Sequence, residues 1–325
     1  MFGGKQGNVL VIKTDGLASF VAAEPAFEAI RDAHEGAKIS LLTTRALQRI
    51  ARASPYFDQV AAAPEMRDAT ARKELVKQLK SNRFAAVYDL SGDDVAKRLF
   101  RAMGPFRPKW RSAPAPDKRA RKTALHSAPD FTSALTAAGI DAPERAPDCV
   151  WALEARKDSA NMKPSWYGIS GAYGLLLPAI DPEHRWTAEG YAELAMKMAD
   201  EGFMPVLAGP RELHGLGDDI AEDTPQLVDL TGKTDHLQLA ALARDAAFFV
   251  SDTADEMRLA ISVGCRGVVI LKTNAVDNAP SGRDVVILTT NGGYEKVQSS
   301  FVWQTLTNMG LNHTTAKPPL SEPAS

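Results

Sequence analysis

The sequence predicts an α/β protein with two domains, each built around a doubly wound parallel sheet. Its 325 residues exceed the size at which a single hydrophobic core usually stops growing. Short apolar runs alternate with segments of helical periodicity in the first half, and the same alternation restarts in the second half. With 45% apolar and 24% charged residues, the composition is that of an ordinary globular protein. We therefore expect two successive βα domains.

In the first half, apolar runs and helical patterns follow one another in β-α-β order, which implies a parallel sheet. The expected strands are residues 9–12, 38–42 and 85–90, and the expected helices are residues 25–33 and 75–79. Phe27 and Ile30 lie on one face of the first of these helices. Proline, arginine and lysine break the pattern over residues 104–122, so we expect a surface loop there.

The second half repeats this rhythm after a connection over residues 141–165 that is interrupted by three prolines. The expected strands are residues 173–177, 204–208, 247–250 and 267–271, and the expected helices are residues 187–201, 237–243, 257–263 and 297–309. Thr187 is the expected N-cap of its helix. The predicted domains are therefore residues 1–160 and 161–312, followed by a polar tail, residues 313–325, expected to be disordered.

Charge and cysteine content narrow the functional classes. The net charge is −2 and the pI is about 6.3, so nothing global recruits nucleic acid, and any attraction to phosphate or membrane must come from a local patch. Cys149 and Cys265 are far apart and form no CxxC motif, which fits a reducing compartment without a metal site. The N-terminus does not read as a signal peptide, and no apolar run approaches the roughly 18 residues of a membrane span. We expect a cytoplasmic protein, with peripheral contact to the inner face of the cytoplasmic membrane left open.

An ordered series of motifs resembles glycosyltransferase family 9, the bacterial heptosyltransferases. LLLPAI, HRW, the helix TAEGYAELAMKMADEGF and MPVLAGPRE resemble the family's strand, Lys-x-Trp, helix and Gly-Gly-Pro-x-Glu sequence. DLTGKTDHLQLAALARDAAFFVSDTADEMRLAISVG resembles its Leu-Thr-Gly loop, Leu-x-x-Leu-Ala helix and Asp-Thr-Gly-x-x-His-Leu-Ala segment. VLVIKTDGLASFVAAEPAFEAIR resembles its first strand, loop and helix, so the resemblance spans residues 8–310.

The resemblance implies a GT-B fold, in which two Rossmann-like domains face each other across a cleft. It also implies that the helix near residues 297–309 crosses back to the first domain. The implied activity is transfer of heptose from ADP-heptose to a lipopolysaccharide core precursor, without a metal or other cofactor. The expected protein is a monomer whose partners are a nucleotide-sugar donor and a phosphorylated glycolipid acceptor.

The donor site is expected in the second domain, because ligands of open α/β sheets bind at the carboxyl ends of the strands. The residues expected there are Pro178, His184, Arg185, Gly209, Glu212, Thr231, Gly232, Ser251, Asp252, Thr253 and Arg258. The backbone amides of the helix that begins near Asp255 are expected to cradle the diphosphate. The family's lysine aligns with His184, and its glycine and histidine with Asp255 and Arg258. Arg185 and Arg258 can supply cations, whereas Asp255 repels phosphate unless it only caps the helix.

The catalytic base is the position at which the chain departs most from the family. The family's aspartate, which is thought to deprotonate the acceptor hydroxyl, aligns with Ser19. A serine needs a partner base at neutral pH. Asp15, four residues earlier, is the candidate substitute, and a turn or cap role for it stays open. Asp93 and Asp94 are further alternatives.

The segment between Phe106 and Lys122 is the expected acceptor-binding loop. Its basic residues are Arg107, Lys109, Arg111, Lys118, Arg119, Arg121 and Lys122, against the single acid Asp117. Phe106 and Trp110 are interleaved with them, a composition suited to lipid phosphates and headgroups. We assign acceptor binding to Arg107, Lys109, Trp110 and Arg111, while a solvated loop stays an alternative. Nucleic acid is a third possible partner of this segment, which the acidic total charge disfavours.

Three functions follow from these patterns. The first is an active transferase that moves a sugar, heptose or a related one, from a nucleotide to a cell-envelope glycolipid. The second is a catalytically degenerate binding or scaffolding protein, suggested by the joint loss of the aligned aspartate, lysine, glycine and histidine. A nicotinamide-dependent dehydrogenase is disfavoured, because the first loop reads KTDGLAS and no G-x-G-x-x-G follows a first-turn strand.

Overall fold

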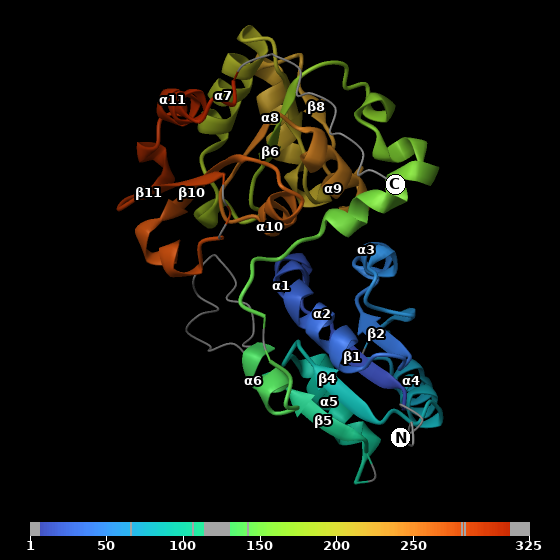
Figure 1. Cartoon of the computed structure of the whole chain (residues 1–325). Helices are drawn as coiled ribbons and strands as arrows, with labels where there is room; N and C mark the ends of the chain where they lie inside the picture. The colour runs from blue at the N-terminus through green and yellow to red at the C-terminus, as the bar shows by residue number, and fades with distance from the viewer. Residues whose placement is uncertain are drawn as a thin grey trace. The chain divides into compact units, whose positions relative to one another are not determined.

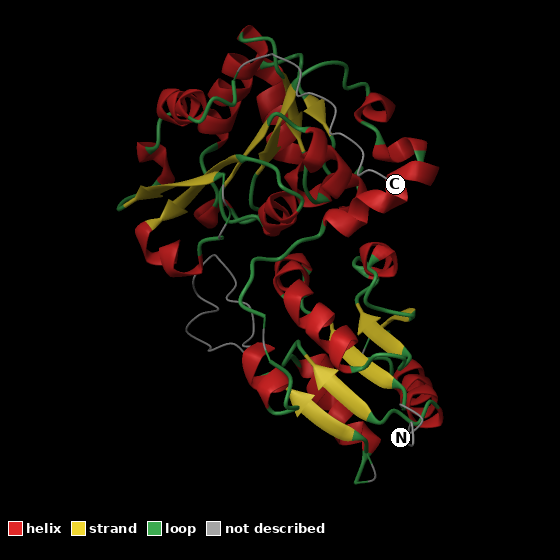
Figure 2. Ribbon diagram, in the orientation of Figure 1, coloured by secondary structure: helices red, strands yellow, loops and turns green. Residues whose placement is uncertain are grey.

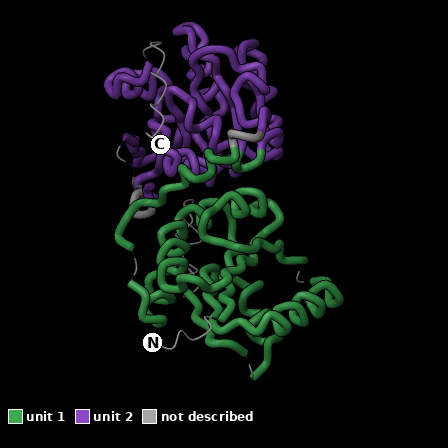
Figure 3. The backbone as a smooth tube through the Cα atoms, turned by 45° about the vertical axis from the view of Figure 1, so that its right-hand side comes forward, with its two compact units in different colours: residues 1–157, 235–237 green, residues 158–234, 238–325 purple. Residues whose placement is uncertain are grey.

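The computed structural model describes residues 7–65, 67–105, 107–113, 131–141, 143–280, 282 and 284–312. The chain forms two compact units, and Figure 3 shows them in different colours. Unit 1 contains Met1–Lys157 and Asp235–Leu237, and unit 2 contains Asp158–Thr234 and Gln238–Ser325. The expected tail, residues 313–325, and the part of the basic segment at residues 114–122 lie outside the described residues.

Unit 1 is built on a parallel sheet with the strand order β3-β2-β1-β4-β5 (Figure 1). Its strands are β1 Val9–Lys13, β2 Ile39–Thr43, β3 Gln59–Ala62, β4 Ala86–Asp89 and β5 Lys109–Ser112. The central strand β1 is buried at all five positions, as a strand covered on both faces must be. The β-α-β order expected from the sequence therefore produces the expected parallel sheet.

Helices cover both faces of this sheet (Figure 2). They are α1 Leu17–Ala22, α2 Glu24–Ala33, α3 Gln48–Ala53, α4 Ala69–Ser81, α5 Asp94–Met103 and α6 Phe131–Thr136. The helices α4 and α5 are neighbours, and their apolar residues Leu75, Leu79 and Leu99 form one core with Leu10 and Val87 of the sheet. A sheet buried in this way leaves the loops at its carboxyl edge as the place for a ligand.

The expected surface loop over residues 104–122 is wrong in its first part. Residues Lys109–Ser112 form the edge strand β5, which pairs with β4 in register Ala86↔Lys109. The sequence did not predict this strand, because its polar residues form no apolar run. An edge strand tolerates lysine and arginine because it is exposed on one side.

Unit 2 contains a second parallel sheet, with the order β11-β10-β9-β6-β7-β8. Its strands are β6 Tyr173–Leu177, β7 Met204–Leu207, β8 Val228–Asp229, β9 Phe248–Ser251, β10 Gly267–Lys272 and β11 Val285–Thr290. Four of them were expected from apolar runs. The others were missed: β8 has only two residues, whereas β11 was overlooked although it begins with the apolar run VVIL.

The helices of unit 2 are α7 Ala188–Asp200, α8 His214–Asp223, α9 His236–Asp245, α10 Asp255–Ser262 and α11 Ser299–Asn308. As expected, Thr187 caps α7, and its hydroxyl accepts a hydrogen bond from the backbone N–H of Gly190 at 3.0 Å. Trp303 and Leu306 of α11 belong to the same core as α7 and β10. Within the described residues, no helix is long and apolar enough to cross a membrane.

The connection between the units starts with a segment anchored to unit 1. Arg145 donates hydrogen bonds to both carboxylate oxygens of Glu24, at 2.7 and 3.0 Å, and it also pairs with Glu28. The backbone N–H of Asp148 donates to Glu24 as well. The buried Glu24 carboxylate thus has several partners, which offsets the cost of its removal from water. The 3-10 helix Val150–Asp158 follows.

Candidate functional site

A cluster of charged and hydroxyl side chains lies at the carboxyl end of β1 in unit 1. Lys13 is fully buried, and its ammonium group donates to Ser19 Oγ at 2.6 Å and to the Leu90 carbonyl at 2.9 Å. It also pairs with Asp15, with 2.8 Å from Nζ to Oδ1. The Phe131 ring covers the ammonium group at 4.6 Å from its centroid. Burial lowers the pKa of Lys13, while the Asp15 carboxylate opposes this shift.

The structure brings together the two expected catalytic residues, Asp15 and Ser19. Ser19 Oγ donates a hydrogen bond to Asp15 Oδ2 at 2.7 Å. Between them, Gly16 adopts φ 102°, a left-handed conformation that favours glycine, and it starts α1. The turn at Gly16 explains how a carboxylate four residues before Ser19 reaches the serine hydroxyl. Sequence spacing alone could not show this contact.

The alternative carboxylates, Asp93 and Asp94, lie at the start of α5. Asp93 Oδ1 accepts a hydrogen bond from the Ala96 N–H, so this side chain caps the helix. Its other oxygen accepts a hydrogen bond from Thr14 Oγ1 at 2.7 Å. Asp93 is therefore already engaged in holding the β1 loop against the β4 loop.

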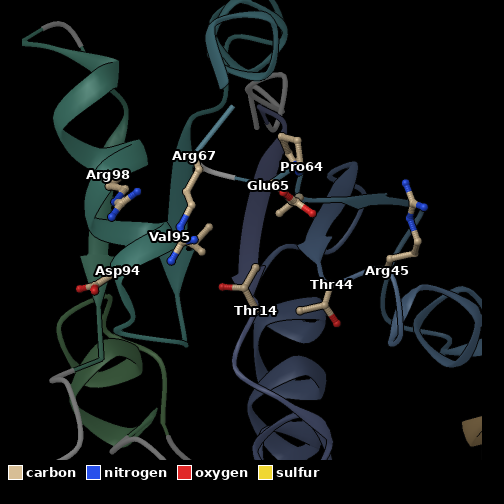
Figure 4. Close-up of a pocket in the computed structure, with 10 residues that line it drawn as sticks. Thr14, Thr44, Arg45, Pro64, Glu65, Arg67, Asp94, Val95 and Arg98 are labelled. Atoms are coloured by element: carbon tan, nitrogen blue, oxygen red, sulfur yellow. The ribbon is translucent and has the colours of Figure 1, made fainter. Parts of the chain in front are cut away.

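A cavity of about 570 Å³ opens at the carboxyl edge of the unit 1 sheet. Three arginines line it, Arg45 after β2, Arg67 after β3 and Arg98 on α5. In Figure 4 the hydroxyl groups of Thr14 and Thr44 are drawn between Arg45 and the other two arginines. Glu65 and Asp94 also line the cavity. Guanidinium groups of this kind suit phosphate or carboxylate ligands.

The sequence did not predict these arginines as site residues. Arg67 follows β3, a strand that we did not predict because its residues are partly exposed and form no clear apolar run. Arg98 lies on a helix that we did not predict either. The rule that ligands bind after the strands of a parallel sheet would have found Arg45, which follows the expected strand at residues 38–42, and also Arg67 if β3 had been recognised.

The expected acceptor residues lie elsewhere in unit 1. Lys109, Trp110 and Arg111 are consecutive residues of β5, and Arg107 precedes that strand. In the register of the sheet, Ser112 is level with Asp89, so Lys109 and Arg107 lie toward the amino edge, away from the end of β1. The Arg107 guanidinium stacks on the Phe100 ring, 3.9 Å from its centroid. Phe106 and residues 114–122 are outside the described part of the chain.

In unit 2, the expected donor residues lie in the loops at the carboxyl edge of the sheet, but three of them make internal bonds. Ser251 Oγ donates to the Leu177 carbonyl at 2.6 Å. Asp252 is fully buried and accepts hydrogen bonds from the N–H groups of Ala179 and Trp186, at 2.8 and 2.9 Å. The Thr253 hydroxyl donates to the His184 carbonyl at 3.0 Å. These three side chains fasten the loop after β6 to the end of β9.

Asp252 also accepts a hydrogen bond from the Tyr191 hydroxyl at 2.9 Å. Burial raises the pKa of Asp252 to about 6, although its three donors oppose the shift. The buried Trp186 is held at its other side, where Nε1 donates to the Val297 carbonyl. This network organises the loop from Pro178 to Trp186.

Two expected donor-site residues, His184 and Arg185, lie on that loop. His184 Nδ1 is 2.8 Å from Asp181 Oδ2, which engages the imidazole with its own loop. Arg185 reaches the Ala179 carbonyl at 3.5 Å, and its Nε is buried without a hydrogen-bond partner in the described structure. Lys272, which we had not singled out, donates to the Glu183 carbonyl and lies 5.0 Å from the Tyr294 ring centroid.

The loops after β7 and β8 are joined by a backbone hydrogen bond from the Gly232 N–H to the Gly209 carbonyl, at 2.8 Å. Thr231 is buried, and its hydroxyl bridges Asp229 and His214 at 2.8 and 2.7 Å. The expected donor residue Glu212 lies nearby on the exposed 3-10 turn Arg211–Leu213. Hydrogen bonds thus hold these loops together at the carboxyl edge of the unit 2 sheet, where the Asp252 network also lies.

Helix α10 begins at Asp255, as expected, and two acids occupy its first turn. Asp255 and Glu256 stand where a diphosphate would meet the helix amides, and no side chain caps this end. Burial raises the pKa of Glu256 to about 7, and the neighbouring Asp255 and Asp252 add to the shift. Burial also lowers the pKa of Arg258, one turn further along. Within the described residues, no group of three or more His, Cys, Asp or Glu side chains can hold a metal ion.

A model of glycosyltransferase family 9 (heptosyltransferase) matches residues 72–290, about two thirds of the chain. The chain belongs to glycosyltransferase family 9. The predictions of this family and of an α/β, GT-B-type glycosyltransferase are therefore confirmed. No curated protein matches the chain.

Solved structures of family 9 proteins have the same fold. The glycosyltransferase family 9 protein from Veillonella parvula DSM 2008 superposes with a TM-score of 0.76, at 16% identity over 96% of this chain and 99% of that one. The ADP-heptose lipopolysaccharide heptosyltransferase II from E. coli gives 0.69, at 17% identity over 93% and 98% of the two chains. The E. coli heptosyltransferase WaaC with ADP gives 0.68, at 16% identity over 93% and 99%.

Proposed function

We propose that this family 9 protein is an active transferase that moves a sugar, heptose or a related one, from a nucleoside diphosphate to a phosphorylated cell-envelope glycolipid. The observation that carries the proposal is the cluster of Lys13, Asp15 and Ser19. The family's base aligns with Ser19, and the Asp15 carboxylate is hydrogen-bonded to that serine at 2.7 Å. The chain therefore keeps a carboxylate at the place where the aligned aspartate is missing.

In the proposed reaction, Asp15 accepts the proton of the acceptor hydroxyl. The hydroxyl oxygen forms a bond to the anomeric carbon of the donor, and the bond from that carbon to the phosphate oxygen breaks, so that the electron pair leaves with the nucleoside diphosphate. Ser19 and Lys13 both donate to Asp15 Oδ2, at 2.7 and 3.0 Å, and fix the orientation of the carboxylate. Because Lys13 is fully buried, it acts by positioning Asp15 rather than by contact with the substrate.

The acceptor is proposed to bind in the cavity lined by Arg45, Arg67 and Arg98. Thr14, which lies between Lys13 and Asp15 in the sequence, lines this cavity, and we propose that an acceptor bound there extends its hydroxyl to Asp15. Phosphate or carboxylate groups of a lipopolysaccharide-type acceptor would pair with the three guanidinium groups. This cavity replaces residues 107–111 as the proposed acceptor site.

The donor is proposed to bind at the carboxyl edge of the unit 2 sheet, without a metal. Two similar structures, E. coli WaaC in complex with ADP and with ADP-2-deoxy-2-fluoro heptose, make ADP-heptose the first donor to test. Gly209, Glu212, Gly232 and Arg258 remain the proposed contacts, while Ser251, Asp252 and Thr253 are proposed to support the site through the loop that they brace. The protein is proposed to act in the cytoplasm as a monomer.

The acids of α10 favour a second candidate function, a binding or scaffolding protein without turnover. Asp255 and Glu256 occupy the helix end at which the diphosphate is proposed to bind, and like charges there oppose it.

Calorimetry and thermal shift with ADP, UDP, GDP and their sugar conjugates separate the two functions. An active transferase is stabilised by one nucleotide and consumes the corresponding sugar nucleotide with a lipopolysaccharide-core acceptor. If no nucleotide binds at millimolar concentration, the transferase proposal fails and the scaffold is favoured. Binding without sugar transfer, measured with a panel of phosphorylated glycolipids, would also favour the scaffold.

A further inference from the structure

The outer surface formed by α4 and α5 is strongly basic. Residues 67–111, which include both helices, contain twelve lysines and arginines against five acids. The exposed cations of the two helices include Lys73, Lys77, Lys80, Lys97 and Arg101. None of these five forms an ion pair within the described part of the chain, so their positive charge is not neutralised by the protein.

The cations share one surface because the apolar residues of both helices point the other way. Leu75 and Leu79 of α4, and Leu99 and Met103 of α5, pack into the core against the sheet. Lys73, Lys77 and Lys80 follow one another at intervals of four and three residues, so they lie along one face of α4. We call the exposed side of these two adjacent helices the α4–α5 face.

A basic cavity lies at one end of this face. It has a volume of about 550 Å³ and lies between the ends of α4 and α5 and the turns into β4 and β5. Its cations are Lys80, Arg83 and Arg107, and no acid lines it. Arg107 is held in place by the Phe100 ring and by a 3.0 Å hydrogen bond to the Gly104 carbonyl. The arginine-lined cavity of the proposed acceptor site lies at the start of α5, toward the other end of the face.

The two parts of the chain differ in charge as well. Residues 1–157 contain 26 lysines and arginines against 18 acids, a net charge of +8. Residues 158–325 contain 12 against 22, a net charge of −10. The small net charge of the whole chain therefore conceals a strongly basic first part, and seven of its 26 lysines and arginines lie on α4 and α5.

We propose that the α4–α5 face docks on an anionic lipid bilayer, with headgroup phosphates as its occupants. Clusters of four to eight exposed lysines and arginines are attracted to anionic bilayers within about one Debye length of the surface. The basic cavity beside Lys80 gives one phosphate a place with three cations and apolar walls, among them Leu79 and Pro105.

A bilayer fits this face better than a nucleic acid does. The helices α4 and α5 lie side by side on the sheet, so neither projects as the single helix that a major groove accommodates. Phe100 and Trp110 are half-buried and stack edge to face on each other, so they do not offer a platform for bases. The face instead presents dispersed cations, which match a surface of many equivalent phosphates.

One consequence rests on the proposed function. A face that lies on the membrane would bring the arginine-lined cavity close to the headgroup of an acceptor that is anchored there by its lipid. The docking itself requires neither a donor nor turnover.

Co-sedimentation of the full chain with vesicles tests the docking. We expect binding to phosphatidylcholine vesicles that contain phosphatidylglycerol, no binding to pure phosphatidylcholine vesicles, and a steep loss of binding as salt rises. The variant Lys77→Glu/Lys80→Glu should bind the anionic vesicles more weakly by about tenfold or more. The matched control Lys38→Glu/Arg52→Glu makes the same charge change at two exposed residues of unit 1 outside α4 and α5, and it should bind nearly as the parent does.

Several results would overturn the proposal: no binding of the parent to anionic vesicles at low salt, equal binding by parent and Lys77→Glu/Lys80→Glu, or equal losses in both double variants. Tighter binding to a nucleic-acid oligomer than to vesicles at the same salt would reassign the face. Thermal unfolding of each variant verifies that it is folded. Because vesicle binding is measured without substrates, failure of the transferase proposal would leave this result unchanged.

Discussion

The two units place polar side chains at the same edge of the same kind of sheet, yet use them differently. In unit 1, Asp15 remains 23% exposed, with a buried lysine and a serine hydroxyl directed at it. In unit 2, Asp252 is fully enclosed and accepts three hydrogen bonds from its own unit. We propose that the first carboxylate meets a substrate, whereas the second holds a loop.

The difference shows that an aligned motif residue need not be a ligand. Asp252 and Thr253 align with the family motif after a single insertion, but their side chains are directed at Trp186 and His184 of the neighbouring loop. Asp15 lies four residues before the position that aligns with the family's base, yet its carboxylate accepts a hydrogen bond from Ser19, which occupies that position.

The largest effect is expected for Asp15→Asn, which removes the proposed base and keeps the size of the side chain. Sugar transfer should fall by a factor of about 10²–10⁴, the usual contribution of general base catalysis. The measurement is the initial rate of nucleotide release with saturating donor and acceptor. Ser19→Ala is the control, since it removes one hydrogen bond to the carboxylate but not the base, and it should lose far less. If Asp15→Asn kept full activity, Asp15 would not be the base, and the proposed contrast between the carboxylates of Asp15 and Asp252 would be lost.

Asp252→Asn is expected to affect stability rather than chemistry. An asparagine accepts through one oxygen only, so buried donors among Ala179, Trp186 and Tyr191 lose a partner, at a cost of about 2–3 kcal/mol in the free energy of unfolding. Urea denaturation measures the loss. Thr253→Val, which removes a single bond, should cost about 1 kcal/mol. Unchanged stability together with lost nucleotide binding would show that Asp252 contacts the ligand after all.

Replacing Arg98 with alanine tests the cavity of unit 1. The Michaelis constant for the acceptor should rise about tenfold, as expected for one guanidinium-anion contact, while that for the donor stays constant. Arg52→Ala, at an exposed arginine of unit 1 outside this cavity and outside α4 and α5, is the matched control. A selective rise for the donor would instead indicate that the cavity binds the nucleotide.

A smaller, pH-dependent effect is expected for Glu256→Gln. The pKa of Glu256 in the folded protein, about 7, lies above its usual 4.5, so the folded state holds this proton more tightly than the unfolded state does. The contribution of Glu256 to stability therefore falls as pH rises from about 4.5 to 7. Above pH 7 the variant should be more stable than the parent by about 1–2 kcal/mol, because the side chain keeps some contact with solvent.

At pH 4 parent and variant should be equally stable, which thermal denaturation at both pH values can verify. The variant should also bind the nucleoside diphosphate more tightly at pH 8, since one charge at the start of α10 is gone. A constant stability difference at all pH values would mean that Glu256 does not titrate in this range.

The sequence predicted the fold better than the site, for a physical reason. Buried strands such as β1 and β9 can be recognised in the sequence as apolar runs. The edge strands β5 and β8 contain polar residues, so their sequences resemble those of loops. The partners of Lys13 show the limit at the site. Asp15 and Ser19 are close to it in sequence, but Leu90 and Phe131 reach it only through the fold. The fold also determines the direction of the Asp252 side chain, which faces inward. The spacing of residues in the sequence does not predict this direction.

Because Lys13 is buried, its chemical reactivity reports whether the cluster around it is open or closed. An amine with no surface exposure is shielded from acylating reagents and from acetylation as long as the cluster is closed. Opening of the loop at Gly16 or displacement of Phe131 would uncover it. The labelling rate of Lys13 can be measured by mass spectrometry and compared with the rates of the exposed lysines of α4. It would therefore show how often the cluster of Lys13, Asp15 and Ser19 opens in solution.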